Sequence, residues 1–306
     1  MKSFSHQRGL SITELMVAMT IGLFITLLAT GLLASNQAAY LAQDQYAQVQ
    51  ETGRYAMEML ARAIRQAGYK KLDAASSTTD IHPHVIGMDA SSLKRTTAGL
   101  DAAASSTVVN GSDVLALSYA SDEAMFNCAG MTVTSVDKDE DAWSMFFVGR
   151  DRTGEPELRC KYRSRRGWNA DAIARGIESF QVLYGLDADD NGVVDRYINA
   201  SDVEAMDDVI PLNGENAIAW LADRQQRTHW KKVRAVKVSI LVRSAQAARD
   251  EDAKMAYHLF DAAYQNADDI GVHINEQDMP VSERKRIRKV FTQTIQLRNG
   301  GAADGI

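Results

Sequence analysis

The 306-residue chain is predicted to be an α+β protein in which one long N-terminal helix packs on an antiparallel β-sheet head. Two observations predict this class. Apolar side chains recur at helical spacing between residues 10 and 67, with no proline among them. After residue 113, short runs rich in β-branched and aromatic residues alternate with turn formers. An antiparallel sheet covered on one face by the second half of the helix buries both apolar patterns.

Residues 10–33 are predicted to form a membrane-spanning helix. Residues 15–33 contain no ionisable side chain, and this stretch is long enough to cross a hydrocarbon core of about 30 Å. Lys2 and Arg8 precede the stretch, and the next basic residue after it is Arg54. By the positive-inside rule, the N-terminus is expected in the cytoplasm and the head on the other side of the membrane.

Glu14 is the one charged residue inside this apolar segment. A carboxylate within a membrane helix costs about 2.5–3.5 kcal/mol on insertion scales, so such a residue needs a partner. No Lys, Arg or His lies within residues 10–33. The partner of Glu14 is therefore expected from another chain or from a charge that processing creates.

The run GLSITEL at residues 9–15, after a short basic leader, resembles the type III signal of type IV prepilins and type II secretion pseudopilins. The resemblance implies that a prepilin peptidase removes residues 1–9 by cutting between Gly9 and Leu10, and N-methylates Leu10. It also implies that Glu14, the fifth mature residue, meets a new terminal amine during assembly. Leu10 departs from the usual Phe or Met. Cleavage would thus create the cation that Glu14 lacks, and these opposite charges attract far more strongly in a low-dielectric setting than in water.

Two other interpretations of the N-terminus stay open. A cleavable secretory signal has an apolar stretch of about 7–15 residues. The stretch here is longer and has an acid near its start. An ordinary single-span anchor explains the length and the orientation, but it explains neither the spacing from Gly9 to Glu14 nor the unpaired acid.

The helical pattern continues beyond the span. Residues 34–68 are predicted as the amphipathic second half of the same helix, with Gly68 as its stop. Together the two halves form a helix of about 87 Å at 1.5 Å per residue. Residues 69–112 are rich in Ala, Ser and Thr and are predicted as an exposed loop.

Residues 113–299 are predicted to form the β-rich periplasmic head. The predicted strands are 114–119, 131–136, 143–148, 158–162, 177–186, 233–242 and 291–297. An insertion at 244–289 separates the last two strands, and its middle, around residues 253–264, is predicted to be helical. Residues 300–306 are expected to form a flexible tail.

The blocks at 177–185, 233–238 and 290–299 resemble those of PilW-type minor pilins. The resemblance implies a type IV pilin-like fold and a subunit without catalytic activity that helps initiate a type IV pilus and sits at its tip. Its implied partners are the other minor pilins, the major pilin, an adhesin-like tip protein and the prepilin peptidase. The implied location is the inner membrane and then the pilus, in support of twitching motility and adhesion. A type II secretion minor pseudopilin and a membrane-anchored periplasmic binding module are the alternatives.

Enzyme and nucleic-acid functions find little support. The chain has no Gly-x-Ser-x-Gly elbow, no phosphate-binding glycine loop and no His-Glu-x-x-His pair. The formal net charge is −6, which disfavours broad nucleic-acid affinity. Basic clusters at 163–166 and 284–289 lack interleaved aromatic residues, so they are predicted to be solvated faces and nucleic acid is not an expected partner.

Cys128 and Cys160 are the two cysteines of the chain. In an oxidising periplasm a disulfide is their expected state. Such a bridge would constrain the unfolded chain by about 3–4 kcal/mol. The alternative is two unpaired thiols that lie too far apart to join.

The acidic loop after residue 186 resembles part of a calcium-binding loop. Asp187, Asp189, Asn191 and Asp195 follow the spacing of the first nine positions of an oxygen-ligand loop. The twelfth position is Ile198 rather than the usual glutamate. An Asn-Gly pair between two strand-like runs is also a hairpin signal. No cofactor is required by the predicted function, and calcium is an optional ligand.

Overall fold

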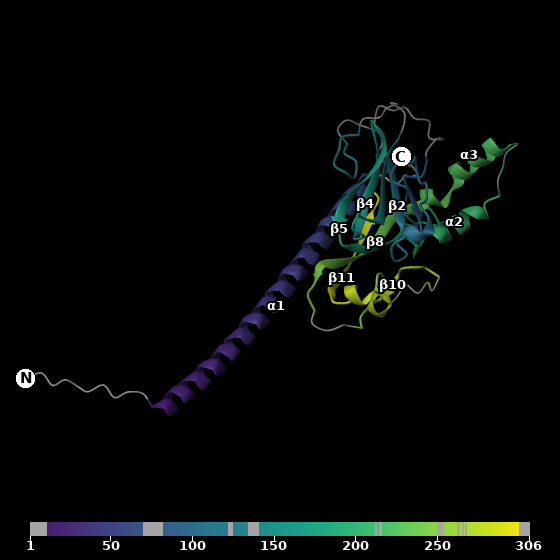
Figure 1. Ribbon diagram of the computed structural model, residues 1–306. Helices are drawn as coiled ribbons and strands as arrows, with labels where there is room; N and C mark the ends of the chain where they lie inside the picture. The colour runs from purple at the N-terminus through teal and green to yellow at the C-terminus, as the bar shows by residue number, and fades with distance from the viewer. Residues whose placement is uncertain are drawn as a thin grey trace, which may run out of the picture.

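The computed structural model shows one long helix that carries a β-rich head on its C-terminal half (Figure 1). The described residues are 11–69, 82–121, 125–133, 141–211, 213, 216–249, 254–261, 264, 266 and 268–299. Gly9, Leu10 and the predicted tail at 300–306 lie outside these residues. All pairs of named strands are antiparallel, which confirms the predicted fold class.

The helix α1 spans Ile12–Gln66, or 55 residues, and is about 82 Å long at 1.5 Å per residue. It begins at the N-cap Ser11 and ends at the C-cap Ala67. Gly68 follows with φ 73°, a left-handed conformation that glycine adopts at low cost. The helix bounds therefore agree with those predicted from the sequence within the described residues.

A five-stranded sheet forms one part of the head. Its order is β1 (Val85–Met88), β2 (Val114–Tyr119), β3 (Ala142–Arg150), β4 (Pro156–Ser164) and β5 (Gly167–Arg175). The prediction of an exposed loop over 69–112 is wrong for β1, because Val85 pairs with Leu117 and is buried. The strand has only four residues and lies between polar segments, so its apolar run was too short to stand out in the sequence.

A four-stranded sheet forms the other part. Its order is β11 (Arg286–Gln296), β8 (Val233–Ala247), β6 (Ile177–Leu186) and β7 (Arg196–Ile198). The sequence predicted a single sheet, whereas the chain passes from one sheet to the other at Gly176, between β5 and β6. Gly176 has φ 76° and donates its N–H to the carbonyl of Pro156 at 2.8 Å, while its own carbonyl accepts the N–H of Arg243 at 2.8 Å. A Cβ atom there would lie 2.8 Å from the carbonyl oxygen of Arg243, so glycine is required at this crossing.

Smaller elements fill the connections. They are α2 (Ala200–Asp208), α3 (Ala217–Arg227), the strands β9 (Ala256–His258) and β10 (His273–Asn275), and the short turns η1 (Ser105–Thr107), η2 (His229–Lys232), η3 (Glu276–Asp278) and η4 (Val281–Glu283). The predicted helix at 253–264 is wrong where the chain is described, because β9 occupies its place. In the predicted strand at 131–136, only an isolated bridge from Thr132 to Phe126 is present in the described part, and residues 134–136 lie outside it.

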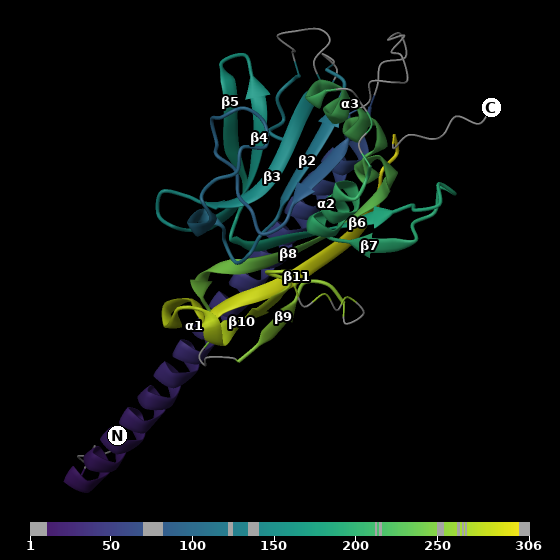
Figure 2. The same cartoon turned by 90° about the vertical axis from the view of Figure 1, so that its right-hand side faces the viewer.

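The core lies where the second half of α1 meets both sheets (Figure 2). Leu60 and Ile64 of α1 are fully buried in one cluster with Phe146 of β3, Phe180 of β6 and Ile240 of β8. Small residues in the last turns of the helix allow this close approach. The head and the C-terminal half of α1 therefore share one hydrophobic core.

Candidate functional site

The first turn of α1 contains two residues that cap each other. The hydroxyl of Ser11 accepts the backbone N–H of Glu14 at 3.2 Å, and the carboxylate of Glu14 accepts the backbone N–H of Ser11 at 2.9 Å. This capping box satisfies two N–H groups that would otherwise be unpaired at the start of the helix. Sequence analysis gave Glu14 no partner within the chain, although the Ser-x-x-Glu spacing was the signal for one. The partner of Glu14 in the structure is Ser11, which is uncharged and directly follows Leu10.

The first half of α1 makes no packing contact with the head. Every residue from 12 to 40 is exposed, and the most apolar 18-residue window has a mean hydropathy of 2.2 with none of it buried. Thr20, Thr26 and Thr30 donate their hydroxyls to carbonyls of their own helix at 2.8–2.9 Å. These hydroxyls need no water, which suits an apolar surrounding. By length and composition, this segment fits a membrane anchor.

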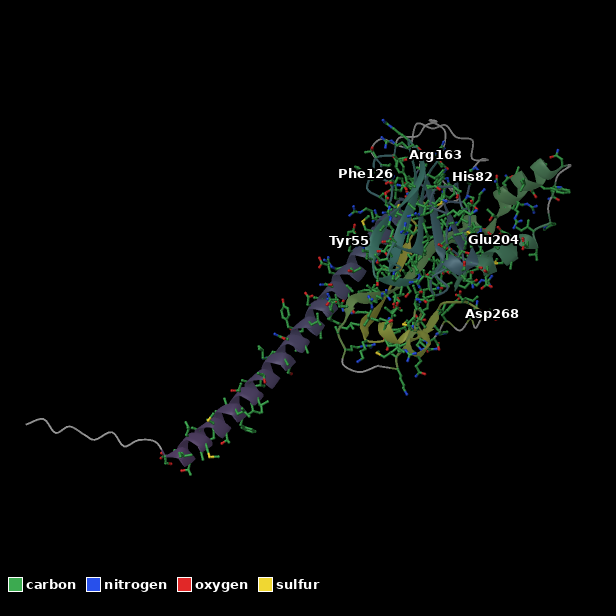
Figure 3. All side chains as sticks on the ribbon, in the orientation of Figure 1. Tyr55, His82, Phe126, Arg163, Glu204 and Asp268 are labelled. Atoms are coloured by element: carbon green, nitrogen blue, oxygen red, sulfur yellow. A yellow bond between two sulfur atoms is a disulfide. The ribbon has the colours of Figure 1, made fainter. Side chains whose placement is uncertain are left out.

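The second half of α1 is attached to the head from Gln45 onward. Gln45 is 2% exposed, and its side-chain oxygen accepts the backbone N–H of Gln246 in β8 at 3.0 Å. Further along the helix, Gly53 faces the ring of Phe291 in β11, and a Cβ atom at residue 53 would overlap that ring. Figure 3 shows the contrast between this packed part and the side chains that project freely from the first half.

The end of α1 is held by the last block of the chain. The side-chain amide of Asn299 donates to the carbonyl of Ala67 at 3.1 Å. The N–H of Leu297 donates to the carbonyl of Arg234 at 2.9 Å, and the N–H of Gly68 donates to the carbonyl of Ser118 at 2.8 Å. These bonds satisfy a terminal carbonyl of the helix and fix its direction relative to both sheets.

The structure joins Cys128 and Cys160 in a disulfide. Their Cα atoms are 5.9 Å apart, and the two cysteines are 32 positions apart in the chain. Cys160 lies in β4 and both residues are buried. The bridge attaches the segment 125–133 to the five-stranded sheet, which is the pairing that the sequence offered as a candidate.

The four residues of the acidic loop lie close together. Asp187, Asp189 and Asp195 each offer one carboxylate oxygen, and these oxygens lie within 4.8 Å of one another. The backbone N–H of Asn191 donates to Asp187 at 2.9 Å, and Arg234 pairs with the same carboxylate at 3.0 Å. Burial raises the pKa of Asp187, but the hydrogen bonds from Arg234 and the loop backbone outweigh it and hold the pKa below its ordinary value.

This loop fits an oxygen-ligand cation only in part. Three carboxylates are enough charge for Ca²⁺, which takes six to eight oxygen ligands. Asp187 is already neutralised by Arg234, and Asp195 accepts the N–H of Ala188 at 2.7 Å. Ile198 at the twelfth position offers no carboxylate. The hydrogen bonds close the loop, and β6 and β7 pair on either side of it.

A buried cluster of ion pairs, which sequence analysis missed, joins three strands of the four-stranded sheet. Glu178 of β6 accepts hydrogen bonds from Arg243 of β8 at 2.9 Å and from Arg288 of β11 at 2.6 Å. Arg288 also reaches Glu276 at 3.3 Å, and none of these four side chains is more than 3% exposed. The prediction of a solvated face at 284–289 is therefore wrong for Arg288. Buried charges are tolerated only when paired in this way, and the pairing partners are distant in sequence.

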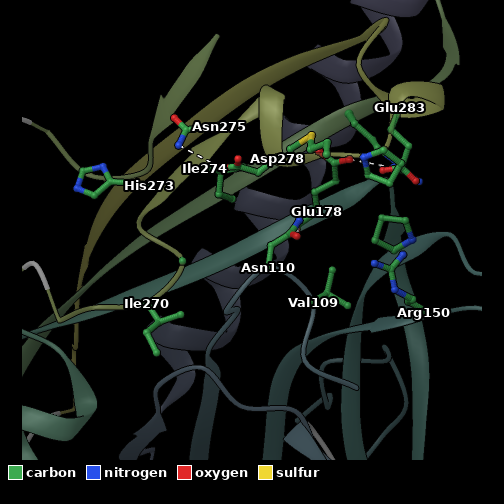
Figure 4. A pocket seen from close by; sticks show the side chains of 15 residues that line it. Val109, Asn110, Arg150, Glu178, Ile270, His273, Ile274, Asn275, Asp278 and Glu283 are labelled. Carbon is green, nitrogen blue, oxygen red and sulfur yellow. Dashed lines mark hydrogen bonds and ion pairs between the residues drawn. The ribbon is translucent and has the colours of Figure 1, made fainter. Parts of the chain in front are cut away.

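A cavity of about 350 Å³ lies beside this cluster (Figure 4). Its lining includes Asn110, Arg150, Glu178, His273 and Glu283. The lining residues include no Ser, Thr, Cys, Lys or Tyr, so they provide no hydroxyl, thiol or amine nucleophile. Arg243 pairs with both Glu178 and Glu283, at 2.9 and 2.8 Å. These ion pairs neutralise the charge of Arg243 where β6, β8 and η4 meet.

Comparison with known proteins identifies one family. The family described as PilW, Type IV Pilus-assembly protein W, matches residues 145–299, which is just over half of the chain. Among solved structures, a type IV-like pilin from Thermus thermophilus is similar with a TM-score of 0.39 and 11% identity, over 84% of this chain and 97% of that one. No curated protein matches the chain.

Proposed function

Because the chain belongs to the PilW family of type IV pilus-assembly proteins, we propose that it is a minor pilin, a structural subunit that helps initiate the filament and sits at its tip. The observation that carries this proposal is the division of α1. Residues 12–40 present apolar side chains that no described part of the chain covers, while the rest of the same helix is fixed in the head. Such a helix is stable in lipid, and then among the helices of other subunits in a filament core.

The proposed route into the filament begins with processing. A prepilin peptidase cuts between Gly9 and Leu10 and N-methylates Leu10, which leaves a cationic amine one residue before Ser11. The carboxylate of Glu14 already turns back toward the N–H of Ser11. It is therefore directed at the end of the helix where the terminal amine of a neighbouring subunit would approach. Exchange of a neutral N–H for a charged amine would be strongly favourable in the membrane interior.

The proposed topology follows from the basic leader. The N-terminus lies in the cytoplasm, α1 crosses the inner membrane, and the disulfide-bonded head lies in the periplasm before it moves to the cell surface with the pilus. The proposed partners are the other minor pilins, the major pilin and an adhesin-like tip protein. Twitching motility and adhesion are the processes that the filament would serve.

Two experiments, one on the mature protein and one on a deletion strain, test this function. Mass spectrometry of the mature N-terminus should find methylated Leu10. A strain that lacks the gene should lose surface filaments and twitching, and the wild-type gene should restore both. Retained Met1 would instead favour a membrane-anchored periplasmic binding module. Normal filaments with defective secretion would favour a type II minor pseudopilin.

Calcium binding by the acidic loop is a separate and narrower proposal. We infer that Asp187, Asp189 and Asp195 hold Ca²⁺ only at millimolar concentration, because an ion must compete with Arg234 for Asp187. Isothermal titration with CaCl₂ should show weak binding that Asp189→Asn abolishes. The substitution Arg234→Gln should strengthen it. Micromolar binding by the unaltered chain would show that Arg234 does not compete.

A further inference from the structure

Two exposed histidines face each other across the β9–β10 pair, and His273 also borders the cavity beside the ion-pair cluster. His258 of β9 and His273 of β10 are directly opposite in the antiparallel register. Their Nδ1 atoms are 2.7 Å apart, and their rings meet edge to face with centroids at 4.7 Å and planes at 76°. Both residues are exposed. Figure 2 places the hairpin beside the four-stranded sheet, on the side away from the five-stranded one.

The backbone beneath these imidazoles is fixed. The alternate residues Tyr257 and Ile274 point to the other face, where they pack with Leu241 of β8 in a separate hydrophobic cluster. The hydroxyl of Tyr257 donates to Glu276 at 2.8 Å, inside the buried ion-pair cluster. Side chains alternate across a strand, so burial of one face holds the two histidines on the other. The pair is therefore preorganised by the packing of its neighbours.

A hydrogen bond between two neutral imidazoles uses one Nδ1 as donor and the other as acceptor. The pair binds a metal ion instead when both rings carry their proton on Nε2 and rotate so that both Nδ1 lone pairs face a common point. With metal–nitrogen bonds of about 2.0–2.1 Å, two neighbouring ligands lie about 2.9 Å apart in a square-planar ion and about 3.4 Å apart in a tetrahedral one. The observed 2.7 Å is close to the first value and well below the second.

We propose that His258 and His273 form a two-histidine site for a divalent ion of square-planar preference, with Cu²⁺ preferred over Ni²⁺ and both over Zn²⁺. The preference follows from the spacing and from the general order of affinities for nitrogen ligands. Among the described residues, no Asp, Glu or Cys completes a set of three ligands around the pair. Water or a second molecule therefore supplies the remaining positions.

An ion bound by both histidines would join the two strands, which already pair in the structure. Each strand of the β9–β10 pair has three residues, and a two-stranded hairpin of this length has little stability of its own. An ion that binds only the folded hairpin stabilises it by mass action. The ion would also leave an open coordination position on an exposed surface of the head. The inference depends on the hairpin alone and does not require the proposed pilin function.

Titration of the full-length, tag-free protein in detergent with CuCl₂ tests the site. Electron paramagnetic resonance should show one Cu²⁺ per chain with two nitrogen ligands, at micromolar affinity. His258→Asn and His273→Asn should each weaken this binding by about tenfold or more, because each removes one of the two ligands. His82→Asn is the matched control, since His82 is an exposed histidine outside the hairpin, and should change nothing. ZnCl₂ should bind more weakly than CuCl₂.

Unchanged copper binding in the double variant His258→Asn/His273→Asn would overturn the proposal, and tighter binding of Zn²⁺ than of Cu²⁺ would overturn the assigned geometry. Thermal unfolding without metal shows whether the variants fold. If the variants do not fold, chemical modification of the wild-type protein tests whether the two histidines bind copper. Cu²⁺ should then protect His258 and His273, but not His82, from diethyl pyrocarbonate, and absence of that protection would also overturn the site.

Discussion

The two halves of α1 are one continuous helix, yet their contacts differ completely. From Ile12 to residue 40 every side chain is exposed, whereas Val49, Leu60 and Ile64 further along are at most 1% exposed. The first half is apolar on all sides, and the second has one apolar stripe. A helix that is apolar all round needs a surrounding solvent or set of partners, while a striped one needs a single surface. The difference shows that the head stabilises only half of its own helix.

The glycines of α1 also differ between the two halves of the helix. A Cβ atom added at Gly22 or Gly31 would meet nothing within 4 Å, while one added at Gly53 would meet the ring of Phe291. Glycine in the middle of a helix costs about 0.5–1 kcal/mol relative to alanine. At Gly53 the cost is offset by the aromatic contact. At the other two positions nothing within the described part of the chain offsets it.

The largest expected effect comes from the same substitution made in each half. Leu60→Ala should lower the free energy of unfolding of the head by about 2–5 kcal/mol, because it leaves a cavity in the shared core. Leu27→Ala, at a side chain that is 62% exposed, should change it by less than about 0.5 kcal/mol. Denaturant unfolding of the detergent-solubilised chain, followed by tryptophan fluorescence, measures both. Equal losses would mean that the first half also stabilises the head.

A smaller effect is expected at the glycines. Gly53→Ala should destabilise the head by about 1–3 kcal/mol, since the new methyl group displaces Phe291. Gly31→Ala should instead leave the head unchanged and make the helix itself slightly more stable. A double-mutant cycle of Gly53→Ala with Phe291→Ala checks the cause, because the cost of the added methyl group should largely disappear once the ring is gone. Independent effects in that cycle would exclude the contact as the cause.

The boundary between the halves can be located at Gln45. Gln45→Ala should cost about 1 kcal/mol, because it removes the buried side-chain oxygen that accepts the backbone N–H of Gln246. Gln43→Ala, two residues earlier at an exposed position, should cost nothing measurable. Hydrogen exchange of the Gln246 amide provides a direct reading, since it should speed up in the first variant only. A comparable effect of Gln43→Ala would move the boundary toward the N-terminus.

Local signals explain what the sequence predicted well. The bounds of α1 depend on the absence of proline, a cap at Ser11 and a glycine after Ala67, all of which are short-range features. The strands at 114–119 and 177–186 are dense in apolar and β-branched residues and were predicted to the residue. β5 was missed because only two of its nine residues are buried, so it lacks an apolar pattern.

Long-range pairing explains most of what was missed. The division into two sheets depends on Gly176, whose role appears only when the carbonyl of Arg243 lies against it. The pairing of Glu178 with Arg243 and Arg288 joins residues 65 and 110 positions apart, and no local pattern specifies it. The capping box of Glu14 is different, because it depends on a short-range Ser-x-x-Glu spacing that is present in the sequence.

The smallest expected effect on stability, with the largest on assembly, comes from Glu14. Glu14→Gln keeps an acceptor for the N–H of Ser11 but removes the charge, while Glu14→Ala removes both. Neither should change membrane insertion or the stability of the head, which lies at the other end of the helix. If the carboxylate pairs with the terminal amine of a neighbour, both variants should fail to co-purify with the other minor pilins and should reduce surface filaments. If Glu14 serves only to cap the helix, Glu14→Gln should assemble normally and only Glu14→Ala should be defective. The pair of variants therefore separates the capping role from the proposed pairing with a neighbouring subunit.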